Sequence, residues 1–438
     1  MNTSQIRGQK LVIDRLGQRG EGIAQGPDGL VFTPYALPGD VVLAEVEGER
    51  GILLEVLEPS KDRLPAFCPH YGTCGGCAVQ ALSPQPYAEW KRDLVVQALR
   101  HSKIETNVSP MLDGHGQGRR RATFHARILR DALGRVRVDV GFMKARAHDI
   151  VNIEACPVLA PEMGGAARAA HALARALSSL GKPLDILITA TQTGLDVDVR
   201  GCGELEEGPR RALIAEAARL DLARVSNHGQ VVIERRPPVL PMGRAVLQPP
   251  PGAFLQATQA GEELLAQLAC ERAGKARRVL DLFSGVGTFA LRLAEKATVH
   301  AVENDRAALA SLIRASGDAG PALKPITTDV RDLFKRPLPV LDLEAFDVVL
   351  FDPPRAGAEA QAREIALSKV PVVIAVSCNV QTFARDARIL IDGGYSLDEV
   401  TPVDQFRHSA HVEMVATFRK QRVTGQTKGK GNRKRLLG

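Results

Sequence analysis

The chain has 438 residues, enough for about three domains and for a large core that needs no disulfide or metal staple. Charged residues make up 24% and hydrophobic residues 45%, which is ordinary for a soluble globular protein. The sequence contains no uninterrupted run of about 18 apolar residues, which argues against a transmembrane helix. The N-terminus is polar and has no apolar core, which argues against a signal peptide. We therefore expect a cytoplasmic protein without a membrane partner.

The net charge of +7 comes from 57 Lys and Arg residues against 50 Asp and Glu residues. The excess lies at the C-terminus, because residues 419–438 hold eight basic residues and no acidic one. We expect residues 421–438 to be a disordered tail, either a phosphate-binding arm or a solubilising segment. Taken alone, the tail is weak support for a nucleic-acid partner.

The N-terminal residues predict a small β-rich unit. Strand-like stretches at 11–13, 41–46 and 52–57 are separated by Gly and Pro turns. A short barrel of the OB type is expected, since it leaves no open sheet edge. Polar residues at 15–20 allow either a generic barrel or one that contacts RNA.

The stretch from 61 to 250 mixes helical and strand patterns, which predicts a central α+β domain. Residues 87–100 carry apolar side chains at helical spacing, and further helices are expected at 162–179 and 209–220. Strands are expected at 136–140, 186–188 and 231–234.

From residue 278 onward strands alternate with helices, which indicates an α/β fold with a doubly wound parallel sheet. The expected parallel strands are 278–283, 298–303, 346–351 and 372–377. Two further strands, 395–402 and 411–418, complete the sheet.

The first of these strands runs into a glycine-rich turn, DLFSGVG at 281–287. Such glycines let the backbone approach a ligand closely, and they fit dinucleotide enzymes as well as methyltransferases. The acid at the strand end, Asp281, and the DPPR segment at 352–355 favour S-adenosylmethionine. Glu303 ends the next strand, where a carboxylate can hold both ribose hydroxyls.

Two residues near the C-terminus are candidates for chemistry. Cys378 follows a buried strand and precedes an expected helix, whose N-terminus should lower the thiol pKa from about 8.5. Most cysteines are only small buried apolar residues, and Cys202 and Cys270 are expected to be structural. Glu413 lies among apolar residues, where a carboxylate is costly unless it is paired or functional.

Four motifs, in this order, resemble the RNA uracil-5 methyltransferases, which make 5-methyluridine in ribosomal and transfer RNA. The motifs are DLFSGVGTF from 281, DPPRAG from 352, VSCN from 376 and HSAHVE from 408. The resemblance covers essentially the whole chain and implies Cys378 as nucleophile and Glu413 as the proton-abstracting base. It implies S-adenosylmethionine contacts from Gln256, Phe283, Glu303, Asp352 and, for the adenine edge, Asp329.

The residues and the resemblance together predict the domain organisation. Residues 1–60 are expected to form an OB-like β-barrel of the TRAM type, and residues 61–250 a central α+β domain with a cysteine cluster. Residues 251–420 are expected to form a Rossmann-like class I methyltransferase domain, followed by the basic tail.

The expected reaction explains why a thiolate and a base are needed together. Carbon 5 of uracil is a poor nucleophile, but attack of the Cys378 thiolate on carbon 6 gives an enolate that can take the methyl from the sulfonium. Glu413 then removes the proton at carbon 5, and the cysteine is expelled. The target base must leave its stack, so loop or single-stranded RNA is expected.

Three of the seven cysteines, Cys68, Cys74 and Cys77, crowd into a Gly-rich loop, and Cys156 is the best candidate for a fourth ligand. The odd total argues against a disulfide framework. Four thiolates suit zinc or an iron–sulfur cluster, and His70 is an alternative ligand. The resemblance implies a 4Fe–4S cluster, with a structural role because methyl transfer needs no electron.

The leading prediction is methylation of a uridine in 23S ribosomal RNA by a monomer, because the TRAM-like segment and the four cysteines resemble that branch. Transfer RNA is the alternative substrate. A non-catalytic RNA-binding or assembly factor is the alternative class of function, against which intact Cys378 and Glu413 argue. An adenine amino-group methyltransferase is disfavoured, because Arg355 stands where an aromatic residue would be needed to stack on the base.

Overall fold

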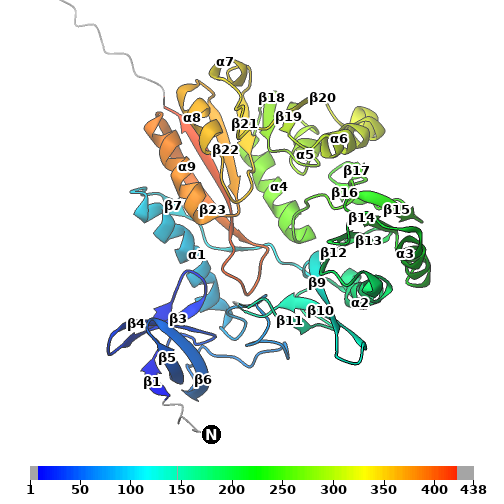
Figure 1. Ribbon diagram of the computed structural model, residues 1–438. Coiled ribbons are helices and arrows are strands. Elements are labelled where there is room, and N and C mark those ends of the chain that lie inside the picture. Colours follow the sequence, from blue (N-terminus) through cyan, green and yellow to red (C-terminus); the bar gives the residue numbers. More distant parts are fainter. Residues whose placement is uncertain (1–7, 146, 422–438) are drawn as a thin grey trace, which may run out of the picture.

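The computed structural model describes residues 8–145 and 147–421 and arranges them in a six-stranded, a seven-stranded, a two-stranded and a nine-stranded sheet (Figure 1). The expected tail, 421–438, lies outside the described residues apart from Gln421. None of the helices in these two ranges is long and apolar enough to cross a bilayer.

The N-terminal sheet has the strand order β1-β5-β6-β4-β3-β2. Its strands are β1 Gln9–Val12, β2 Arg15–Leu16, β3 Glu21–Gly26, β4 Gly29–Pro34, β5 Val41–Glu47 and β6 Arg50–Glu58. Neighbours pair antiparallel except β4 and β6. The sheet curls until the Asp14 N–H donates to the Ile23 carbonyl at 2.8 Å, around a core that includes Val31 and Val42.

The expected strands in this unit correspond to β1, β5 and β6, and β2 to β4 were not expected. The sequence of β3, EGIAQG, has glycine at two of its six positions and therefore lacks the β-branched run that identifies a strand. These short strands have little intrinsic β-propensity, and burial of their apolar side chains inside the curled sheet stabilises them instead.

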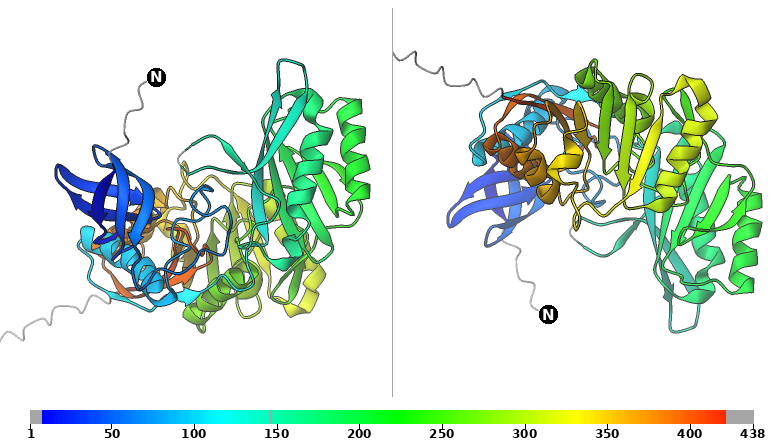
Figure 2. Two further views of the ribbon diagram at one scale, coloured as in Figure 1. Left: turned by 90° about the horizontal axis from the view of Figure 1, so that it is seen from below. Right: turned by 90° about the horizontal axis from the view of Figure 1, so that it is seen from above.

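A seven-stranded sheet in the order β11-β10-β9-β12-β13-β14-β15 forms the middle of the chain (Figure 2). Its elements are β9 Arg121–Arg130, β10 Val136–Met143, β11 Ile150–Asn152, η1 Pro161–Met163, α2 Ala166–Ala176, η2 Ser178–Leu180, β12 Leu184–Thr191, β13 Gly194–Arg200, α3 Glu207–Arg219, β14 Arg224–Asn227 and β15 Gln230–Glu234. Ala166, Ala170 and Leu173 share the buried face of α2, which packs over β9, β10 and β12. The expected helix at 162–179 is divided into η1, α2 and η2, because the adjacent Gly164 and Gly165 weaken its start.

The short hairpin of β16 Leu240–Met242 and β17 Ala245–Leu247 leads into the C-terminal sheet, whose order is β20-β19-β18-β21-β22-β24-β23-β7 with β8 also on β23. Its elements are α4 Gln259–Ala273, β18 Arg278–Leu282, α5 Ala290–Leu293, β19 Thr298–Glu303, α6 Arg306–Ala319, η3 Gly320–Ala322, β20 Ile326–Val330, α7 Val340–Leu343, β21 Val348–Phe351, α8 Glu359–Leu367, β22 Val372–Ser377, α9 Val380–Asp392, β23 Tyr395–Asp404 and β24 Glu413–Lys420. Strands β18 to β22 are parallel to one another. Strand β24 is antiparallel to both of its neighbours, β22 and β23, so β23 again runs in the direction of the parallel strands. This confirms the expected doubly wound α/β fold; β20, at the sheet edge, is an additional strand.

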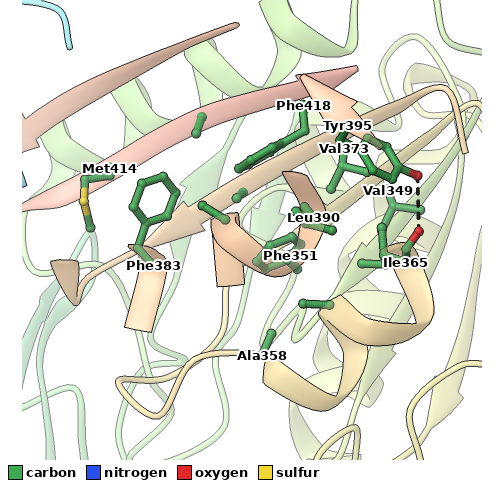
Figure 3. Packing of buried hydrophobic residues seen from close by; sticks show 14 of the residues in the cluster. Val349, Phe351, Ala358, Ile365, Val373, Phe383, Leu390, Tyr395, Met414 and Phe418 are labelled. Atoms are coloured by element: carbon green, nitrogen blue, oxygen red, sulfur yellow. Dashed lines mark hydrogen bonds between the residues drawn. The ribbon is translucent and has the colours of Figure 1, made fainter. Parts of the chain in front are cut away.

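Two apolar cores cover the two faces of the C-terminal sheet. In one of them, Phe351, Phe383 and Phe418 pack with Met414 between β21, β24 and α9 (Figure 3). The buried Tyr395 hydroxyl lies 2.9 Å from the Val370 carbonyl, so its polar end is satisfied inside this core. Because both faces of the sheet are packed in this way, the ends of its strands are held in fixed positions, and functional groups at those ends are held with them.

Residues 84–113, which the sequence assigned to the central stretch, pack on the C-terminal sheet. Helix α1 Pro84–His101 contacts α9, and β7 Asn107–Val108 and β8 Leu112–Asp113 pair with β23. The two strands have two residues each, too short for a period-2 pattern to reveal them. Their effect is to bring α1 against the segment 404–412, which we call the base loop.

Candidate active site

The candidate catalytic residues lie at one edge of the C-terminal sheet, beyond the carboxyl ends of its parallel strands. Asp352 follows β21, and Cys378 follows β22. Glu413 begins the antiparallel strand β24, whose next residue, Met414, is paired with Ser377. This register brings Glu413 next to Cys378, although 34 residues separate them in the sequence.

Cys378 is a partly buried thiol, and its electrostatic environment differs from the sequence prediction. Burial raises its pKa to about 12, and Glu413 and Asp352 add to this while Arg355 opposes it. The expected lowering of the Cys378 pKa by the helix N-terminus is therefore wrong. The side chain of Asn379 accepts the first free N–H groups of α9, at 2.9 Å and 3.2 Å, so the helix terminus is already capped.

Glu413 is 3% exposed, and its pKa is raised to about 8. Burial is the largest cause and the Asp352 carboxylate adds to it, whereas a hydrogen bond from Gln405 and the charges of Lys91 and Arg355 lower it. A carboxylate that titrates near neutral pH can both take up and release a proton under working conditions. This is the electrostatic signature of a general base.

A hydrogen-bonded network joins Glu413 to the expected cofactor side. Gln405 Nε2 lies 3.0 Å from Glu413 Oε1 and 2.7 Å from Gln256 Oε1. Gln256 in turn donates to Asp352 at 3.3 Å, and burial raises the pKa of Asp352 to about 7. The sequence did not identify Gln405; its only signal is its place directly after a strand.

The base loop is clamped by α1. The buried Lys91 pairs with Asp404, and the Tyr87 hydroxyl donates to the same carboxylate at 2.6 Å. The Tyr87 oxygen also accepts the His408 N–H at 2.8 Å. Sequence reasoning missed these residues, although a lysine three positions before Leu94, inside an apolar helical stripe, was a usable signal.

The expected cofactor residues surround the turn after β18. Asp281 is fully buried, and burial together with Asp352 raises the pKa of its carboxyl well above the usual range; the Ala290 N–H lowers it only in part. Donors with hydrogen-bonding geometry reach neither of its oxygens within the described residues. A Cβ on Gly285 would meet open space. A fully buried acid with so little hydrogen bonding, four residues before a glycine that has open space beside it, would be stabilised by a cationic group nearby, such as the sulfonium or ammonium group of S-adenosylmethionine.

The structure also places the other expected cofactor contacts. Glu303 accepts hydrogen bonds from the backbone of Gly285 at 3.0 Å and Asn304 at 2.7 Å. Phe283 follows β18 with a positive φ of 59°, an unusual backbone conformation for this residue type. Asp329, in β20, is engaged by Arg331 at 2.8 Å.

Cys68, Cys74, Cys77 and Cys156 line one cavity of about 190 Å³. Burial raises the pKa of Cys77 to about 12, and the nearby Cys156 and Cys74 add to it. Arg119, which lines the same cavity, opposes that shift. Among the described residues, however, His, Cys, Asp and Glu form no group of three or more at metal-binding distance.

Comparisons with known proteins show which family the chain resembles. Residues 244–421 match the family model described as tRNA (Uracil-5-)-methyltransferase. An uncharacterized RNA methyltransferase of Brucella suis is 45% identical, with 96% of this chain and 100% of that protein covered. The 23S rRNA (uracil(1939)-C(5))-methyltransferase RlmD of Halomonas elongata is 33% identical, with 92% and 88% covered.

A solved structure shares the fold. It is the Pyrococcus abyssi tRNA (uracil-54, C5)-methyltransferase in complex with S-adenosyl-L-homocysteine, with a TM-score of 0.69 and 22% identity over 95% of this chain and 100% of that one. Fold and site together define an S-adenosylmethionine-dependent methyltransferase that acts on RNA. The chain belongs to the RNA uracil-5 methyltransferase family.

Proposed function

We propose that this enzyme methylates carbon 5 of a uridine in 23S ribosomal RNA, with Cys378 as nucleophile and Glu413 as base. The observation that carries the proposal is the meeting of a cysteine with a buried carboxylate that titrates at a pKa of about 8. Both lie where Asp281 and Asp352 converge from neighbouring strands. S-adenosylmethionine, when bound, supplies an electrophilic methyl group.

Cys378 and Glu413 act on different bonds of the uracil ring. The Cys378 thiol first loses its proton to solvent, and the thiolate then bonds to carbon 6 of the uracil while the C5–C6 π bond opens. The released electron pair is shared between carbon 5 and the carbonyl oxygen at carbon 4, which makes carbon 5 nucleophilic. After carbon 5 has been methylated, the Glu413 carboxylate accepts its proton. The electrons of that C–H bond re-form the ring double bond, and the C–S bond breaks with its electron pair returning to sulfur.

The cofactor contacts proposed from the resemblance fit this division. Asp281 lies fully buried behind the turn, while Gln256 and Asp352 are bonded to each other on the side that faces Glu413. Glu303 at the end of β19 is proposed to hold the ribose hydroxyls, and Asp329 the adenine edge. The Phe283 ring, 5.5 Å from that of Phe334, is proposed as an apolar contact.

We further propose that Cys68, Cys74, Cys77 and Cys156 hold a 4Fe–4S cluster. Their cavity of about 190 Å³ has room for a cluster. Four thiolates suit either zinc or an iron–sulfur cluster, and the resemblance to the RNA uracil-5 methyltransferases favours the cluster. Arg119 offers a buried positive charge to the thiolates. Since the methylation needs no electron, the proposed role is structural. Anaerobically purified protein should be brown and contain iron; colourless protein with zinc would contradict this.

The substrate is inferred from the relatives. The 33% identical protein is named for 23S rRNA, whereas the family description and the Pyrococcus neighbour are named for tRNA. The curled sheet of residues 9–58 is proposed to be a TRAM domain that contacts RNA, and the enzyme to act as a cytoplasmic monomer. If the enzyme methylates tRNA transcripts but not 23S rRNA transcripts, the proposed reaction stands and the proposed substrate is wrong.

The test of the proposed function uses RNA transcripts that contain 5-fluorouridine. Fluorine at carbon 5 cannot leave as a proton, so the adduct cannot eliminate, and a covalent protein–RNA complex should persist on a denaturing gel. Cys378→Ala should abolish the complex. Cys270→Ala, at a partly buried cysteine of α4, is the matched control and should leave it intact. A complex that persists in Cys378→Ala would refute the assignment of the nucleophile.

A further inference from the structure

Gln405 is a buried amide that stands between the two halves of the proposed site. It is 0% exposed and is the first residue after β23. Its side chain bonds to Ala257 next to the expected cofactor glutamine, to Gln256 itself, and to Glu413. Gln256 and Gln405 are 149 residues apart in the sequence, so only the fold brings them together.

The orientation of the Gln405 amide is fixed by the backbone. The Ala257 N–H, which can only donate, lies 3.0 Å from Oε1, so this atom has to be the carbonyl oxygen. Nε2 therefore faces Gln256 Oε1 at 2.7 Å and Glu413 Oε1 at 3.0 Å, and both of its hydrogens are used. Toward Glu413, Gln405 acts as a donor, which favours the carboxylate over the acid.

The other groups that face Glu413 act in opposite directions. Burial and the Asp352 carboxylate, beyond β21, raise the pKa of Glu413, while Lys91 of α1 and Arg355 lower it. The Cys378 thiol, beyond β22, lies on the same side. Lys91 and Arg355 act through charge, whereas the Gln405 amide holds one carboxylate oxygen at a defined distance and direction.

We propose that Gln405 is a positioning residue that favours the ionised form of Glu413 and aims its carboxylate at carbon 5, and that it links the base to the cofactor glutamine Gln256. The inference rests on the proposed function of Glu413. It assigns Gln405 to the second half of the reaction, in which the proton passes from carbon 5 to the carboxylate and the C–S bond breaks. Formation of the Cys378 adduct does not need this step and should be spared.

The test compares Gln405→Met with the unsubstituted enzyme on uridine RNA. Methionine keeps the bulk of the side chain and removes both donors. Turnover should fall roughly 10- to 100-fold, the loss expected for one hydrogen bond to a charged group. A methylated covalent protein–RNA complex should accumulate, because elimination becomes slow. The acid limb of the kcat profile, which includes the elimination step, should move up by about one pH unit.

The matched control is Gln361→Leu. Gln361 is also 0% exposed, accepts the Leu338 N–H at 2.8 Å and donates to the Leu338 carbonyl at 3.2 Å, so its loss disturbs only packing and structure. It should lower the melting temperature without moving the pH limb or trapping RNA. Gln405→Asn, which keeps the amide but shortens its reach, should change turnover in the same direction as Gln405→Met and replaces that variant if it does not fold.

The outcomes separate the two levels of the argument. If Gln405→Met loses stability like the control but traps no RNA and keeps the pH limb, the positioning role is overturned. If the unsubstituted enzyme forms no adduct with 5-fluorouridine RNA, the proposed function falls, and the role of Gln405 falls with it. Adduct formation that survives in Gln405→Met, together with slow release of product, supports both.

Discussion

Replacing Lys91 by methionine should destabilise the fold strongly, because Lys91 and Asp404 form a buried ion pair between α1 and the base loop. Lys91 is fully buried, Asp404 is 3% exposed, and Nζ lies 2.5 Å from Oδ1. Removing one partner of such a pair costs about 3–5 kcal/mol, since the other charge stays buried. Asp404 keeps the Tyr87 hydroxyl at 2.6 Å and the Phe406 N–H at 3.1 Å, so we expect the lower part of that range, about 3–4 kcal/mol.

Urea unfolding measures this loss as the change in the free energy of unfolding. The double variant Lys91→Met/Asp404→Asn is the control, because it removes both charges and should recover about half of the loss or more. A loss below about 1 kcal/mol in the single variant would be typical of a solvent-screened pair and would refute the reasoning. A double variant no more stable than the single one would refute it as well.

Changes at the site itself give separate readouts. The Glu413→Gln variant should methylate its RNA but remain covalently bonded to it through Cys378, because an amide cannot take the proton from carbon 5. Free methylated RNA on a denaturing gel, without a covalent complex, would contradict this. Since the Glu413 proton must leave before the residue acts as a base, kcat, which includes the elimination step, should rise about tenfold per pH unit below the Glu413 pKa of about 8. A kcat that is flat from pH 6 upward would rule out this base. Asp281→Asn should weaken S-adenosylmethionine binding roughly 10-fold or more in calorimetry, and an unchanged Kd would mean that the buried acid faces no cationic ligand. Cys77→Ser should lose iron while Cys202→Ser, at a buried cysteine outside the cavity, keeps it; equal iron contents would exclude Cys77 as a ligand.

The positions of the main site residues followed from the sequence, because each stands at the end of a strand. Apolar runs predicted β18, β19, β21 and β22, and in a parallel sheet their carboxyl ends meet at one edge. Asp281, Glu303, Asp352 and Cys378 therefore had to be neighbours. Glu413 was recognisable because a carboxylate among apolar residues needs a reason.

What the sequence could not reveal depends on long-range contacts. Lys91 meets Asp404 across 313 residues, through the two-residue strands β7 and β8 that tie the α1 region to β23. The pKa of Cys378 also escaped prediction. Its position before α9 favours a thiolate, but burial and two neighbouring carboxylates outweigh that effect, and their strength depends on packing.

The central claim is that a proton leaves carbon 5 of the uridine when the methyl group arrives. The most direct measurement uses 23S rRNA transcripts with tritium at carbon 5 of uridine and follows tritium release into water together with methyl incorporation. One tritium should be released for each methyl group added, and Glu413→Gln should add the methyl group without releasing tritium. Methyl incorporation by the unsubstituted enzyme with the tritium retained in the RNA would contradict it.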